Sequence, residues 1–212
     1  MRDFRNYARK EEFNSPSDWD LLAVAQHHGL PTRCLDWTRS PLVGAHFACA
    51  DHSRQNEDGV IWCLNIAQLH LANSAAEPRE AHRPSRYWVK STEMLEQEFP
   101  SLSSFCSTRV SARMLLWEPP ALDSRISNQL GLLSILHDNA YSPTGFLSHH
   151  SKQFSDLIVR IQIRAEAKSE IRDMLDWSGV SERTLFPGLA GLCTWLRRHH
   201  SQPWVHSNAE SE

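Results

Sequence analysis

A stretch of twelve residues, QHHGLPTRCLDW (26–37), gathers side chains that can bind anions and move protons. His27 is the candidate catalytic residue, because an imidazole titrates near neutral pH and can act as a general acid or base. Arg33 offers a guanidinium fork suited to phosphate, and Asp36 stands where it can orient that fork. The structural alternative is a buried ion pair between Arg33 and Asp36, with His27 at the end of a helix. The sequence leaves both interpretations open.

Three neighbouring side chains are candidate ligand contacts. Gln26 shares an apolar helix stripe with Trp19 and Leu22, which favours a buried hydrogen-bonding role over catalysis. Trp37 is favoured as a core residue, although its ring face could support a nicotinamide or adenine ring. Thr38 comes just before a second predicted helix, where backbone amides could bind an anion.

A second candidate cluster lies about a hundred residues further along the chain. Arg125 and Gln129 are four residues apart, which places them on one side of a helical turn. With His137, which follows a predicted strand, they could complete a pocket opposite the 26–38 stretch. The alternative is a surface arginine beside a buried amide. No metal site is predicted, because the chain has no HExxH motif and no CxxC pair.

The elements that must position these residues can be predicted from local signals. A helix from Trp19 should end at Gly29, and another should begin at Pro41 after a Ser40 cap, so that 26–38 is a joint between two helices. Strands are expected within 58–66, 112–120, 131–137 and 155–163, and helices over 166–177 and toward the C-terminus. The mixture predicts an α+β fold: a mixed or antiparallel sheet, helices packed at the N-terminal motif, and a C-terminal closing helix. We expect one domain over residues 1–200 and a polar, disordered tail over 201–212.

Composition limits the functional classes. The chain has 212 residues and a formal net charge of −3, which argues against a broad nucleic-acid-binding surface. Its five cysteines are widely spaced, and no apolar run approaches the roughly 18 residues of a membrane span. We therefore expect a cytoplasmic protein with reduced thiols and no membrane partner; a protein partner remains open.

The run QHHGLPTRCLDWTRSPLVGAHFACA (26–50) resembles the signature of the FRG domain family, Gln-His-x-Gly-x-Pro-Thr-Arg-x-Leu-Asp-Trp-Thr. Later segments also resemble that family: DGVIWCLNI (58–66), SRISNQLGLLSIL (124–136) and SGVSERTLFPGLAGLCTWL (178–196). DFRNYARKEEF is similar to the helix that precedes the signature. The family's Phe-Arg-Gly strand would then be expected before Met1.

The resemblance implies a polar pocket that binds a nucleotide-like ligand, with NAD as a possible cofactor. It further implies a toxin or phage-defence effector with an activity like ADP-ribosyl transfer, on a fold loosely similar to the ADP-ribosyltransferases. Glu96-Gln97-Glu98 is similar to the Glu-x-Glu motif of arginine-specific ADP-ribosyltransferases, although a solvated helix face is the favoured interpretation. The alternative function is a non-catalytic module that binds a protein or nucleic acid, in which the motif is structural.

Overall fold

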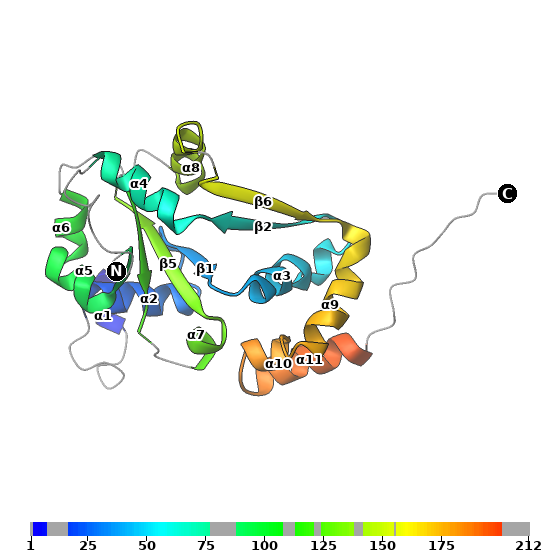
Figure 1. Cartoon of the computed structure of the whole chain (residues 1–212). Helices are drawn as coiled ribbons and strands as arrows, with labels where there is room; N and C mark the ends of the chain where they lie inside the picture. The colour runs from blue at the N-terminus through cyan, green and yellow to red at the C-terminus, as the bar shows by residue number, and fades with distance from the viewer. Residues whose placement is uncertain are drawn as a thin grey trace.

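The computed structural model describes residues 2–7, 17–76, 88–107, 113–120, 124–137, 142–154 and 156–200 (Figure 1). Its helices are α1 (Arg2–Tyr7), α2 (Asp18–His27), α3 (Pro41–Ala50), α4 (Ile66–Ala76), α5 (Thr92–Glu98), α6 (Leu102–Ser107), α7 (Ser124–Asn128), α8 (Pro143–Ser151), α9 (Lys168–Trp177), α10 (Glu182–Leu185) and α11 (Leu189–His200). Its strands are β1 (Leu35–Thr38), β2 (Gly59–Leu64), β3 (Val89–Ser91), β4 (Met114–Glu118), β5 (Gly131–Leu136) and β6 (Ile158–Ile163). The predicted α+β class is confirmed; the 201–212 tail lies outside the described residues.

Helix α2 begins and ends where the sequence predicts. The Ser17 hydroxyl accepts from the Asp20 amide at 3.1 Å, and the Asp20 carboxylate accepts from the Ser17 amide at 3.2 Å, which forms a capping box. At the other end Gly29 has a φ of +83°. The Leu30 amide donates to the Ala25 carbonyl at 2.8 Å, as in a Schellman motif. The chain therefore leaves α2 in a fixed direction.

The predicted joint between α2 and α3 contains a strand that the sequence analysis missed. Strand β1 pairs with β5 in an antiparallel ladder, with Leu35 opposite Ser134 and Thr38 opposite Gly131. The sheet order is β1-β5-β4-β3, and only the β3–β4 pair is parallel among its ladders. The sequence of β1, LDWT, is too short for an alternation of apolar and polar residues to indicate a strand.

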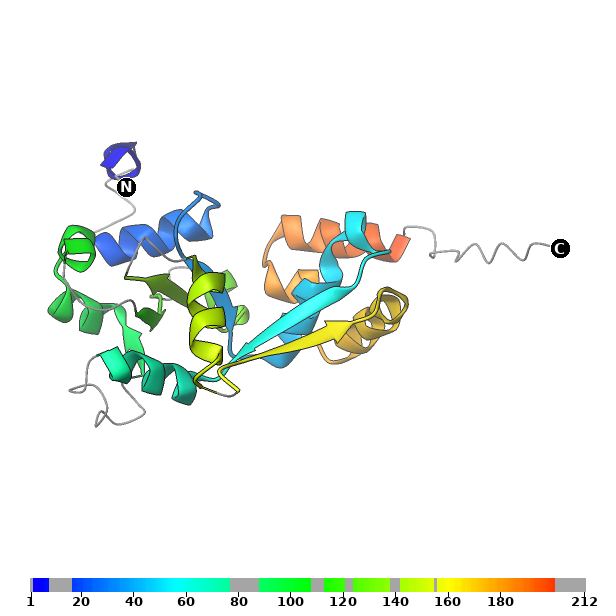
Figure 2. The ribbon, with the colours of Figure 1, turned by 90° about the horizontal axis from the view of Figure 1, so that it is seen from above.

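This sheet is covered on both faces (Figures 1 and 2). Along β4, alternate side chains join different cores, as a pleated strand requires. Leu115 and Trp117 pack with Trp19 of α2 and with residues of α5 and α6. Met114 and Leu116 pack with residues of α4 and α8. The sequence predicts a strand within 112–120, where β4 lies, and the packing shows that both faces of this strand are buried.

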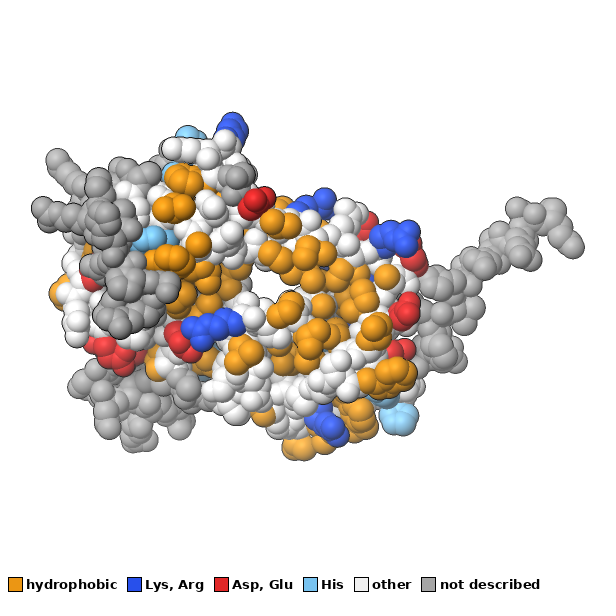
Figure 3. All heavy atoms as spheres, in the orientation of Figure 1, with side chains coloured by type: hydrophobic (Ala, Val, Ile, Leu, Met, Phe, Trp, Pro, Cys, Tyr) orange, Lys and Arg blue, Asp and Glu red, His pale blue; other side chains and the backbone are white. Residues whose placement is uncertain are grey.

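The other sheet is a two-stranded antiparallel ribbon, β2–β6, on the side of the molecule that carries α3 and α9 to α11 (Figure 2). The sequence predicts a buried strand within 58–66, and the alternation over 155–163 predicts that Val159 and Ile161 lie on a buried face. Both expectations are wrong, because Trp62, Val159 and Ile161 are 52%, 45% and 47% exposed. A ribbon of two strands has too few neighbours to cover its side chains. Figure 3 shows hydrophobic side chains gathered beside an opening in this region. None of the described helices is long and apolar enough to span a membrane.

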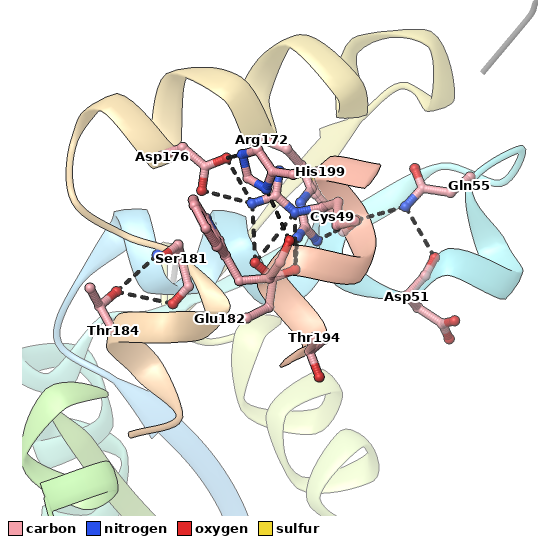
Figure 4. A network of polar contacts seen from close by, with 12 residues as sticks. Cys49, Asp51, Gln55, Arg172, Asp176, Ser181, Glu182, Thr184, Thr194 and His199 are labelled. Atoms are coloured by element: carbon pink, nitrogen blue, oxygen red, sulfur yellow. Dashed lines mark hydrogen bonds and ion pairs between the residues drawn. The ribbon is translucent and has the colours of Figure 1, made fainter. Parts of the chain in front are cut away.

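A buried cluster of charges fixes the C-terminal helices against α3 (Figure 4). Arg172 of α9 contacts the Glu182 carboxylate and donates to the Cys49 carbonyl at 3.3 Å. Arg198 of α11 donates to Glu182 at 3.1 Å and to Asp176 at 2.7 Å. The Glu182 carboxylate is thus shared between guanidinium groups from two helices, which compensates for its burial.

We expect stability to fall as the pH is lowered. Burial, with the Arg172 charge, lowers the pKa of His46 from 6.5 to about 4. Between pH 6.5 and pH 4, His46 is therefore protonated in the unfolded chain and neutral in the folded one, which favours unfolding. Burial alone would raise the pKa of Glu182, but hydrogen bonds from Arg198 and the nearby guanidinium charges lower it from 4.5 to about 2. His46 should therefore reduce stability between pH 6.5 and 4, and Glu182 below 4.5.

Urea unfolding at a series of pH values measures this effect. His46→Gln should flatten the dependence between pH 6.5 and 4 relative to the wild type. The matched control is His200→Gln, at an exposed position on α11, which should leave the profile unchanged. An identical slope for His46→Gln and wild type would contradict the assignment.

The close approach of α10 and α11 depends on Gly191. A Cβ at this position would overlap the Phe186 carbonyl oxygen and lie 2.6 Å from that of Glu182. Gly191→Ala should lower the free energy of unfolding by about 3 kcal/mol or more, the cost of overpacking against backbone. Gly44→Ala is the matched control, because its Cβ would lie 3.5 Å from the Ile61 side chain, an ordinary contact. Equal stability of the two variants in urea unfolding would refute the packing argument.

Candidate functional site

Gln26 organises the turn between α2 and β1. Its side-chain amide donates to the Asp36 carboxylate at 2.6 Å, and its oxygen accepts from the Thr32 hydroxyl. The Thr32 hydroxyl in turn accepts from the Cys34 amide at 2.9 Å. These bonds link the end of α2 to the start of β1, so the predicted hydrogen-bonding role of Gln26 agrees with its surroundings.

The hypothesised ion pair between Arg33 and Asp36 is not formed. Asp36 contacts Gln26, whereas the exposed Arg33 donates to the Cys106 sulfur of α6 at 3.1 Å. An odd separation in an extended chain sends the two side chains to opposite faces, and the sequence analysis did not expect extended chain here. Arg33 remains a candidate ligand contact only as a surface residue.

Trp37 and Thr38 connect β1 to β5. The Trp37 indole donates to the Ser134 hydroxyl at 2.8 Å, and its ring packs at the edge of the core shared with α4 and α8. The Thr38 hydroxyl donates to the Gln129 carbonyl at 2.7 Å and accepts from the Ser40 amide at 3.1 Å. Ser40 caps α3 as predicted. The favoured core role of Trp37 agrees with this packing.

The second predicted cluster is divided between the two ends of β5. Gln129 precedes the strand and donates to the Leu185 carbonyl at 3.1 Å, and the Arg125 guanidinium lies 4.7 Å from the centre of the Phe186 ring. His137 follows this strand of six residues, whose length is roughly 20 Å, and is buried with its ring 5.0 Å from that of Phe105. The structure therefore joins Arg125 and Gln129 to Thr38 and α10, and it places His137 at the other end of β5.

His27 and Cys34 are the remaining side chains of the motif that could take part in proton transfer or nucleophilic attack. His27 is half-buried at the end of α2, with its ring edge-to-face with His28 at 5.2 Å. Burial raises the pKa of the Cys34 thiol to about 11, so this group stays protonated at neutral pH and is a poor nucleophile. Within the described ranges, no group of three or more His, Cys, Asp and Glu side chains is placed to hold a metal ion.

A pocket that sequence reasoning missed lies where β3 leaves part of β4 uncovered. β3 pairs with residues 116–118 of β4, so among the described residues the backbone at Met114 has no strand neighbour on that side. The Asn73 amide of α4 takes the place of a strand there. It donates to the Met114 carbonyl at 2.9 Å and accepts from the Met114 amide at 3.1 Å. The pocket beside it is lined by Ile66, Leu69, His70, Asn73, Trp88, Lys90, Arg113, Met114, Leu115 and Leu116.

Two buried cations line this pocket. Lys90 is 6% exposed and Arg113 is 5% exposed. Within the described part of the chain, both contact one carboxylate, Glu98 of α5: Lys90 Nζ lies 2.7 Å from one oxygen, and Arg113 Nη2 lies 3.3 Å from the other. The Arg113 guanidinium also lies 5.1 Å from the centre of the Phe99 ring. Glu98 is thus held between two buried cations at the pocket wall.

Two aromatic rings complete the wall. His70 and Trp88 are stacked, with ring centroids 4.9 Å apart and planes at 21°. The Nε2 atom of His70 is buried and has no hydrogen-bond partner among the described residues. The favoured interpretation of Glu98 as part of a solvated helix face is wrong, since its side chain is 24% exposed and bound to two cations. The pocket gave no sequence motif, because its residues come from three separate segments.

Thr32 provides a test of the structural role of the turn. Thr32→Val keeps the shape of the side chain but loses the bonds to Gln26 and to the Cys34 amide, and should lower the free energy of unfolding by about 1–2 kcal/mol. The matched control is Arg33→Ala, at the neighbouring exposed position, which should change stability by about 0.5 kcal/mol or less. Urea unfolding of both variants gives the comparison. If Arg33→Ala proved the more costly change, this account of the turn would be wrong.

Comparison with known proteins identifies the N-terminal part of the chain. The family model described as FRG domain matches residues 1–57, which include α1, α2, β1 and α3. The later segments that resemble this family lie outside the matched residues. A search of curated proteins and of solved structures finds no match. Over residues 1–57, the chain is therefore similar to the FRG domain family, which is the similarity that the QHHGLPTRCLDW motif predicts.

Proposed function

We propose that this protein binds a nucleotide-like ligand through its phosphate in the pocket between α4, β3 and β4. The observation that carries the proposal is Lys90, a buried ammonium at the pocket wall. An ammonium group can donate three hydrogen bonds. Among the described residues, Lys90 donates to the Glu98 carboxylate, so it has donors left for a ligand. Burying a cation is costly, and a bound anion would offset part of that cost.

The neighbouring groups also favour an anion. Arg113 brings a second cation to the same carboxylate, and guanidinium and ammonium groups are the usual partners of phosphate. Attraction between charges is stronger in a partly desolvated pocket than at an open surface. Glu98 would share Lys90 and Arg113 with the ligand, so a bound phosphate would lie beside two cations.

The sequence motif has an architectural part in this proposal. The polar side-chain atoms of four motif residues form hydrogen bonds within the protein: Gln26, Thr32, Trp37 and Thr38. These bonds support the alternative in which the motif is structural. Binding of NAD, and an ADP-ribosyl-transfer activity of a toxin or phage-defence effector, are finer forms of the same hypothesis. Their support is limited to the FRG match and the character of the pocket. The free state of all five cysteines supports a cytoplasmic location.

Isothermal titration of the intact protein with NAD, ADP-ribose and AMP tests the proposal. We expect at least one of these ligands to bind, with an affinity that falls as the salt concentration rises. Lys90→Met should weaken that binding by tenfold or more, because it removes the charge and keeps the length of the side chain.

The matched control is Lys152→Met, at an exposed position after α8, which should bind as the wild type does. Lys90→Arg keeps the charge and should retain binding if Lys90→Met does not fold. Absence of heat with all three ligands, or wild-type affinity of folded Lys90→Met, would overturn the proposal.

A further inference from the structure

We propose that two copies of this chain associate along the outer edge of β6, so that their β2–β6 ribbons join into one antiparallel sheet. In the described part of the chain, β2 and β6 form a sheet of only two strands, and such a ribbon is marginally stable in water. Joining two ribbons gives each β6 a neighbour on both sides. Three features of β6 support this pairing: its open edge, its exposed apolar side chains, and the charges along it.

The outer edge of β6 is open, whereas β2 lies on the side of α3 (Figure 1). The approach of α3 to β2 is close, because a Cβ on Gly59 would lie 2.5 Å from the Ala48 carbonyl oxygen. On β6, by contrast, the four consecutive residues 159–162 are all exposed. An edge strand that is neither covered nor interrupted by proline is a template for pairing with another chain.

The backbone groups that β6 turns outward can be assigned from one hydrogen bond. The Asn65 amide donates to the Leu157 carbonyl at 2.9 Å, so the backbone of Leu157 faces β2. In an antiparallel strand this direction alternates from one residue to the next. The amides and carbonyls of Arg160 and Gln162 therefore point away from β2, toward the open edge.

Exposed β-branched side chains run along the same edge. Val159 and Ile161 are 45% and 47% exposed, and they share a face of the ribbon with the buried Ile163. In a symmetric pair centred on Ile161, the two Ile161 side chains face each other, and Val159 faces Ile163 of the second copy. Such cross-strand pairs stabilise a sheet, and they would remove exposed apolar surface from water.

Charge selects this register over the neighbouring symmetric ones. A pair centred on Arg160 would place the two Arg160 side chains opposite each other. A pair centred on Gln162 would place Arg160 opposite Arg164 of the second copy. Like charges directly opposite each other destabilise a strand pair. Centring the pair on Ile161 avoids both contacts and sets Arg160 opposite Gln162.

Arg160 and Gln162 are also complementary. Among the described residues, the Arg160 side chain has no ion-pair or hydrogen-bond partner. The Gln162 amide donates to the Asp58 carboxylate, which leaves the Gln162 oxygen to accept from Arg160 of the second copy. Hydrogen bonds from Gln162 and from the Ala165 amide lower the pKa of Asp58, so this neighbouring group is negative at neutral pH. The guanidinium would thus meet an acceptor backed by a negative charge.

Sedimentation equilibrium of the intact protein over a range of concentrations tests the proposal. The wild type should form a dimer with a dissociation constant of about micromolar or tighter. Ile161→Lys should weaken the dimer by about tenfold or more, because it replaces the central apolar pair by two opposed charges. The matched control is Leu189→Lys, at an exposed apolar position on α11, which should dimerise as the wild type does.

A disulfide test reads the register directly, in a chain whose exposed cysteines, Cys63, Cys106 and Cys193, are replaced by serine. Ile161 would face its counterpart in a non-hydrogen-bonded pair, with Cα atoms about 4.5 Å apart, within the range of a disulfide. Ile161→Cys should therefore form a covalent dimer on mild oxidation. Val159→Cys is the control, because its counterpart lies four residues along the strand, roughly 13 Å away, and it should not cross-link.

The outcomes are decisive for the proposal. Wild-type protein that stays monomeric at about 100 μM, far above a micromolar dissociation constant, would overturn it. So would a folded Ile161→Lys variant that dimerises as tightly as the wild type. Cross-linking of Val159→Cys in preference to Ile161→Cys would overturn the register. The disulfide test also stands on its own if Ile161→Lys does not fold.

Discussion

The antiparallel pairing of β1 with β5 is the constraint on which the arrangement of this molecule depends. It turns the chain after α2 into the edge strand of a four-stranded sheet, in a register that the Trp37–Ser134 hydrogen bond supports. Strand β5 also separates Gln129 from His137, because Gln129 precedes the strand and His137 follows it. Gln26, Trp37 and Thr38 therefore form hydrogen bonds within the protein. The pocket with the buried cations forms at the opposite edge of the sheet, beside β3.

Features encoded within a few residues were predictable from the sequence. Gly29 ends α2, and Ser40 with Pro41 begins α3, because caps and left-handed glycines act on adjacent backbone. The segment 112–120, which ends in two prolines, indicated the strand β4. By contrast, β1 is defined by a partner strand nearly a hundred residues away, as the contact between Trp37 and Ser134 illustrates. Such pairings depend on tertiary context that a window of sequence does not contain.

The same limit explains the failures at β6 and in the pocket. Alternation along β6 predicted one buried face, yet Ile163 is buried while Ile161 is exposed, because burial depends on what packs over each position rather than on the period alone. The bond between Asn73 and Met114 spans 41 residues, and the pair formed by Arg113 and Glu98 spans 15. Short charged patterns such as Glu96-Gln97-Glu98 look alike on a solvated helix and beside a buried cation, so local pattern reasoning assigns them to solvent.

The FRG motif and the cation pocket are nevertheless connected through α2. The Trp19 indole donates to the Phe99 carbonyl at 2.9 Å, and the Asp18 carboxylate accepts from the Leu102 amide at 2.9 Å, so α2 holds the end of α5 and the start of α6. Glu98 is the last residue of α5 and is the carboxylate that Lys90 and Arg113 share. Displacing α2 would therefore move the acid that places both cations. In this arrangement the Gln26 and Thr32 contacts would influence ligand binding through helix position, without touching the ligand.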